Sequence, residues 1–62
     1  MNKLKELQGR LENLGCLASI DQIRRYLDAS GKTPTDLDQM TDDQVRQWFS
    51  HCLDSLYAHR PS

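Results

Sequence analysis

The spacing of apolar residues between Met40 and Tyr57 constrains the fold of this chain more than any other feature. The apolar positions in this stretch are Val45, Trp48, Phe49, Cys52, Leu53 and Leu56. They recur every three or four residues, as on one face of an α-helix, and not in the alternation of a β-strand. Because the stretch holds the chain's single Trp and single Phe, we expect this helix to form most of the core.

The start of this helix is also indicated. Thr41 is suited to cap it, with Gln44 three residues later able to bond back to the Thr41 amide in a capping box. Met40 and Val45 occupy the positions of a hydrophobic staple across the same turn. We therefore place the main helix at residues 42–58.

The leucines of the first segment form a stripe. Leu4, Leu7, Leu11 and Leu14 repeat at the a and d positions of two heptads, and Gly15 follows as a helix stop. Two heptads are fewer than the three or four that indicate a free-standing coiled coil. The helix, expected at residues 3–14, therefore either packs this leucine stripe on the domain's own core or shares it between two chains.

A second helix is expected at residues 20–30, since Ser19 and Gln22 form another capping-box pair and Gly31 ends the apolar face that follows. After it, Thr33 and Pro34 suit the cap and the first position of a single helical turn. The sequence thus predicts one all-α interaction domain over residues 1–62, with three main helices and room for one extra turn near residue 34.

Size and charge narrow the class of protein. A chain of 62 residues lies near the lower limit for folding alone, and oligomerisation often supplies the missing stability. The net charge is −1, but residues 1–32 carry +2 and residues 33–62 carry −3. This division suits a charged protein partner, or a second copy, better than nucleic acid. Without a signal peptide or a membrane-spanning run, a cytoplasmic location is expected, with Cys16 and Cys52 as reduced core thiols.

Four carboxylates near the middle of the chain are candidates for binding a protein partner: Asp36, Asp38, Asp42 and Asp43. They are close enough in sequence to meet Arg or Lys side chains together. The alternative is structural, because Asp36 and Asp38 are common turn residues and Asp42 and Asp43 would favour the positive end of the helix dipole.

Other site chemistry has little support in the sequence. Cys16, His51, Cys52 and His59 are metal-ligating types, but they lack the close pairs of structural zinc sites, so no metal or other cofactor is expected. Ser50 precedes His51 and Cys52 directly, so the three side chains radiate from one helix instead of converging. We therefore expect no catalytic residue and no enzymatic activity.

Several strings resemble the Hha/YmoA family of small bacterial nucleoid-associated modulators. They are Ser19-Ile20-Asp21 with Arg25 four residues after the aspartate, Met40-Thr41-Asp42-Asp43-Gln44-Val45, Trp48-Phe49-Ser50, and Leu56-Tyr57 with Pro61-Ser62 close behind. The resemblance implies a helical co-regulator that docks on the dimerisation domain of an H-NS-type silencer through charged side chains, with little DNA affinity of its own. It adds Asp21 to the candidate docking residues.

Three functions follow from these observations. The first is a small bacterial, plasmid or phage regulator that acts by binding a protein partner, such as an H-NS-type nucleoid protein. The second is a homodimeric self-association module that uses the leucine stripe. The third is a small DNA-binding repressor that uses Arg24 and Arg25, although the acidic start of the main helix would be repelled by phosphates.

Overall fold

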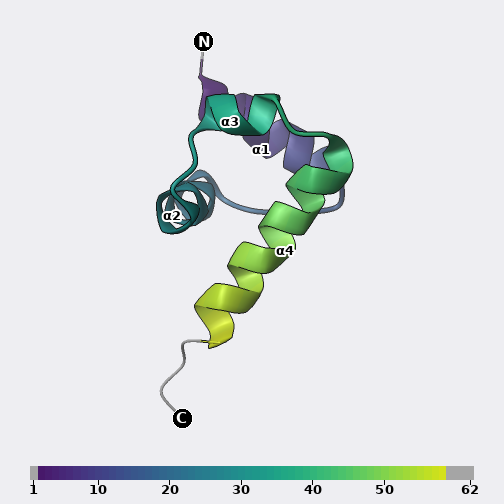
Figure 1. Ribbon diagram of the computed structural model, residues 1–62. Coiled ribbons are helices and arrows are strands. Elements are labelled where there is room, and N and C mark those ends of the chain that lie inside the picture. The colour runs from purple at the N-terminus through teal and green to yellow at the C-terminus, as the bar shows by residue number, and fades with distance from the viewer. Residues whose placement is uncertain (1, 59–62) are drawn as a thin grey trace.

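The computed structural model describes residues 2–58, and the chain there is helical with turns between the helices. The helices are α1 (Lys3–Asn13), α2 (Ile20–Ser30), the short α3 (Pro34–Asp38) and α4 (Asp42–Ala58). Figure 1 shows α1 and α3 together at one end of the molecule, α2 to one side, and the long α4 running past them. The expected all-α fold, with its extra turn at residue 34, is confirmed.

Each of the later helices begins at a side-chain cap. Thr41 Oγ1 accepts from the Gln44 amide at 3.2 Å, and Gln44 Oε1 accepts from the Thr41 amide at 2.9 Å, which confirms the predicted capping box. Ser19 caps α2 by accepting from the Gln22 amide. The reciprocal half predicted there is wrong, because the Gln22 side chain donates to Tyr26 Oη instead.

Glycines end the first two helices. Gly15 and Gly31 have φ of 83° and 67°, a left-handed conformation that other residues adopt only at a cost. Beyond each glycine the next amide, of Cys16 or Lys32, donates back to a carbonyl five residues earlier. These bonds satisfy carbonyls that the helix ends leave without partners.

The core lies where all four helices meet. Its members are Leu7, Leu11, Ile23, Tyr26, Leu27, Leu37, Val45, Trp48, Phe49 and Cys52. Four of the predicted apolar positions of α4 are therefore buried, and Leu53 packs partly against them. Leu56 is different, since it is 45% exposed. The apolar face of α4 is therefore buried at Val45, Trp48, Phe49 and Cys52 but is open at Leu56.

An aromatic junction fixes α4 against α2. Tyr26 makes an edge-to-face contact with Trp48 at 6.2 Å between ring centroids and a tilted contact with Phe49 at 5.2 Å. The Trp48 indole N–H donates to Ser30 Oγ at 2.9 Å, and Ser30 Oγ donates to the Tyr26 carbonyl at 2.8 Å. The polar atoms of this junction are thereby paired while its rings are removed from water.

α4 is longer than the helices it packs against. It has 17 residues, compared with 11 in α1 and 11 in α2, and its last turns extend past the other helices (Figure 1). The described chain is consequently elongated, with extents of 40 × 21 × 19 Å. Within residues 2–58, none of the helices combines the length and the apolar character needed to cross a bilayer.

Candidate functional site

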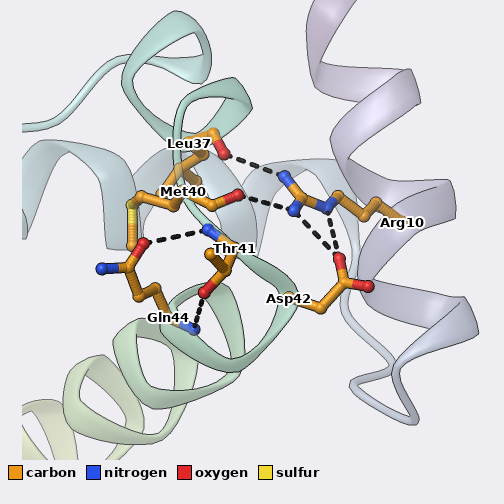
Figure 2. A network of polar contacts seen from close by, with 6 residues as sticks. All are labelled: Arg10, Leu37, Met40, Thr41, Asp42 and Gln44. Atoms are coloured by element: carbon orange, nitrogen blue, oxygen red, sulfur yellow. Dashed lines mark hydrogen bonds and ion pairs between the residues drawn. The ribbon is translucent and has the colours of Figure 1, made fainter.

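Arg10 of α1 holds the corner between α3 and α4, as Figure 2 shows. Its guanidinium donates to the carbonyl oxygens of Leu37 and Met40 at 2.8 and 2.7 Å. It also donates twice to Asp42 Oδ1, at 3.1 and 2.9 Å. The fork of an arginine suits this arrangement, because several N–H groups can point at different acceptors at once. Asp42, a predicted docking residue, is therefore engaged within the chain.

Asp38 is engaged in a second ion pair. Lys3 Nζ lies 2.8 Å from Asp38 Oδ2, and the two side chains are 54% and 49% exposed. The hydrogen bond with Asp38 raises the pKa of Lys3, and the charge of Asp38 acts in the same direction. Water screens a pair this exposed, so it adds little to stability.

Asp36 completes the cap of α3. Its Oδ2 accepts from the Thr33 amide at 2.9 Å and from Thr33 Oγ1 at 3.1 Å. The bond from the Thr33 amide is the main cause that lowers the pKa of Asp36. Since the folded state favours the charged carboxylate, this contact stabilises the fold at neutral pH and is lost as the pH falls through the lowered pKa.

The four mid-chain carboxylates gather at the α3–α4 corner, which we call the acidic pole: Asp36, Asp38, Asp42 and Asp43. Lys3 and Arg10 each form an ion pair with one of them. The charge of Lys32 helps to lower the pKa of Asp36, and Lys32 and Arg46 line a hollow together with Asp43. All four residues are exposed, and Asp43 makes no ion pair within residues 2–58. The structural alternative has support: Asp36 completes the cap of α3, and Asp42 and Asp43 both lie in the first turn of α4, where the helix dipole favours negative charge.

The leucine stripe of α1 faces the chain's own core. Leu7 and Leu11 are only 5% and 0% exposed, and Leu4 and Leu14 pack partly against the same cluster. A second chain could reach only the outer parts of Leu4 and Leu14. Self-association through this stripe stays a prediction. A substitution such as Leu7→Asp would not test it, because a charge at this buried position would unfold the monomer itself.

Asp21 lies apart from the acidic pole, on a groove between α2 and the last turns of α4. The α2–α4 groove has a volume of about 430 Å³ and is lined by Ser19, Asp21, Gln22, Arg25, Tyr26 and Leu56. Leu56 is fourteen residues along α4 from Asp42, which places the groove about 21 Å along the helix from the acidic pole. Arg25 and Leu56 could not be predicted to line one groove, because no local spacing in the sequence relates α2 to the end of α4.

The basic residues proposed for DNA binding do not form a separate patch. Arg24 and Arg25 are exposed on α2, but the same helix exposes Asp21 and Asp28. A face of alternating sign attracts phosphates less than a uniformly basic one. DNA binding stays a prediction that this charge distribution does not favour.

The metal-ligating side chains that the structure describes are separated. Cys52 is buried, with its Sγ 3.7 Å from the Tyr26 carbonyl, whereas Cys16 is half-buried and His51 is exposed. His59 lies outside the described residues. Within residues 2–58, no three His, Cys, Asp or Glu side chains are grouped so as to hold a metal ion. Both cysteines are free in the structure, and their reduced state in the cell stays a prediction.

Burial controls the chemistry of Cys52, because it raises the pKa of the thiol. The thiolate is the reactive form, so in a Cys16→Ser variant we expect Cys52 to react with a disulfide reagent at least about a hundredfold more slowly than in the urea-unfolded chain. Because the pKa of Cys52 is raised in the folded chain, the thiol ionises first in the unfolded chain, at its ordinary pKa of about 8.5. The free energy of unfolding therefore falls as the pH rises above this value. The reaction is followed by the absorbance of the thiol that the reagent releases. Equal reaction rates in the folded and the unfolded chain would contradict the burial of Cys52.

Arg10 and Lys3 were not predicted to contact the later helices. Arg10 lies beside Leu11 on α1, and its partner Asp42 is 32 positions away in sequence. Patterns within one helix carry no information about such a partner. The available signal in the sequence was the position of Arg10 at the edge of the leucine stripe, in a chain that also carries a cluster of carboxylates.

No family model matches this chain, and comparison with the curated proteins and with the solved structures finds no match either. The resemblance to the Hha/YmoA family accordingly stays a prediction.

Proposed function

We propose that this chain is a small bacterial, plasmid or phage regulator that acts in the cytoplasm by binding a protein with a basic surface. The observation that carries the proposal is the acidic pole, where four exposed carboxylates lie at one corner and two of them, Asp36 and Asp43, form no ion pair within residues 2–58. The free thiols of Cys16 and Cys52 suit a reducing compartment.

The acidic pole is also held in place. Arg10 ties the end of α3 and the start of α4 to α1, so the carboxylates keep their relative positions before a partner arrives. A preorganised surface loses less conformational entropy on binding. Charge complementarity at such a surface mainly speeds association and selects among partners.

The partner that the resemblance implies is the dimerisation domain of an H-NS-type silencer. Docking of a helical co-regulator on it would alter transcription without strong contact between the co-regulator and DNA. The mixed charges on α2 support this reading, because they offer phosphates no uniformly basic face.

Asp43→Lys is the sharpest test of the acidic pole. Asp43 is exposed and makes no ion pair within residues 2–58, so its reversal should leave the fold intact. We expect the dissociation constant for a purified H-NS-type dimerisation domain, measured by calorimetry, to rise about tenfold or more. Added salt should weaken the wild-type complex in the same direction.

Asp28→Lys is the matched control. It makes the same change of charge at an exposed position on α2, outside the hollow that Asp43 lines. Equal weakening by both variants would assign the effect to net charge and remove the acidic pole as the docking surface. If the wild-type protein does not bind the domain at low salt, the H-NS-type partner is excluded.

A further inference from the structure

The α2–α4 groove combines an exposed apolar side chain with two charges of opposite sign. Leu56 is 45% exposed at its edge, one of two large apolar side chains that residues 2–56 expose to this degree, with Leu17 at 77%. Asp21 and Arg25 both line the groove and are both exposed. Within the described chain, neither takes part in an ion pair.

Asp21 and Arg25 make the groove self-complementary. They are four residues apart on α2, so they lie on one face of the helix about 6 Å apart along its axis. In a two-fold symmetric contact, residue i of one chain meets residue j of the other and the reverse also holds. Two antiparallel α2 helices would therefore place Asp21 opposite the partner's Arg25 twice, with the symmetry axis passing between these positions.

The acidic pole and the leucine stripe fit a second copy less well than the α2–α4 groove does. At the acidic pole, Asp36 and Asp43 form no ion pair within residues 2–58, so two copies would bring like charges together there. Leu7 and Leu11 of the leucine stripe are already buried in the core. The α2–α4 groove offers both apolar area and paired opposite charges, and it lies beside the turns of α4 that extend past the other helices (Figure 1).

A dimer would have to bury surface beyond the groove itself. A standard interface buries about 800 Å² per partner, roughly a sixth of the 4687 Å² that the chain exposes. An apolar centre with charges around it is the usual composition of such a surface. A chain of this length also gains stability from a partner, because its own core is small.

We propose that a second copy of this chain occupies the α2–α4 groove, with the two Leu56 side chains at the centre and reciprocal pairs between Asp21 and the partner's Arg25. This interface is separate from the acidic pole, and a dimer formed in this way leaves both acidic poles open.

Sedimentation equilibrium over a concentration series tests the proposal. The mass of the wild-type protein should rise from 7.2 kDa toward twice this value as the concentration increases. Leu56→Glu should raise the dissociation constant of the dimer at least about tenfold. Leu17→Glu is the matched control, since it makes the same change at an exposed leucine that does not line the groove, and it should leave the dissociation constant unchanged.

A charge exchange tests the pairing itself. Asp21→Arg alone and Arg25→Asp alone should each weaken the dimer, because each places like charges opposite one another. The double variant Asp21→Arg/Arg25→Asp restores the opposite signs and should recover dimerisation, with circular dichroism confirming the helical content of every variant. A wild-type mass of 7.2 kDa at all concentrations, a Leu17→Glu effect equal to that of Leu56→Glu, or a double variant weaker than both single ones would overturn the proposal. If the protein is a monomer and still binds the H-NS-type dimerisation domain, the proposed dimer is wrong and the proposed function is unaffected.

Discussion

Trp48→Ala is expected to leave most of the chain unfolded at 25 °C. Trp48 is 6% exposed, contacts Tyr26 edge-to-face and donates to Ser30 across the α2–α4 junction. Removing a buried Trp side chain costs about 3–5 kcal/mol, and a single core of this size supplies only about 3–5 kcal/mol in total. Urea titration followed by circular dichroism is the suitable measurement, because the variant lacks the chain's single indole.

Trp48→Phe separates the two parts of this effect. The phenyl ring keeps much of the buried area but has no N–H to donate to Ser30 Oγ. The cost of that loss is about 1 kcal/mol, together with a smaller packing loss, so the phenylalanine variant should remain folded in buffer. If the alanine variant unfolded at the same urea concentration as the wild type, the central role of Trp48 in the core would be wrong.

Arg10→Met is expected to have the next largest effect, a loss of about 2 kcal/mol in the free energy of unfolding. Methionine keeps the apolar stem but cannot donate to the carbonyl oxygens of Leu37 and Met40 or to Asp42. Arg10 is a further donor to the Leu37 carbonyl, which also accepts from the Met40 amide at 3.1 Å, and it bonds the Met40 carbonyl just beyond the end of α3. The midpoint of urea unfolding, followed by Trp48 fluorescence, measures the change.

Two variants show which contacts of Arg10 matter. Asp42→Asn removes the charge of the exposed partner while leaving both carbonyl contacts, so its effect should be the smaller one. Lys3→Met removes the other ion pair of α1, which is exposed on both sides, and should leave the midpoint nearly unchanged. If Lys3→Met destabilised the chain as much as Arg10→Met, the loss would reflect the charge of α1 and not the bonds of Arg10.

The helices could be predicted closely because their boundaries depend on neighbouring residues. Thr33 and Thr41 cap helices through bonds that span three residues, and Gly15 and Gly31 end helices through their own backbone conformation. The spacing of Val45, Trp48, Phe49 and Cys52 likewise identified the buried face of α4 without knowledge of its neighbours.

The rest depended on contacts between distant parts of the chain. Gln22 had two acceptable partners, and the position of Tyr26 decided between them. Leu56 had the right spacing to be buried, but α4 extends past the helices that would cover it. Of the predicted docking residues, Asp38 and Asp42 proved to be paired with Lys3 and Arg10, and sequence spacing indicates neither partner.

The contacts of Arg10 also bear on the order in which the chain folds. They join residues 27 to 32 positions apart, so α1 must meet the α3–α4 corner before any of them can form. The caps of α3 and α4 need no such encounter and can form in a chain that is otherwise open. A contact made after the rate-limiting step acts on the unfolding rate and hardly on the folding rate. We expect the long-range contacts of Arg10 to form late, so that Arg10→Met raises chiefly the unfolding rate, whereas loss of a local cap lowers the folding rate.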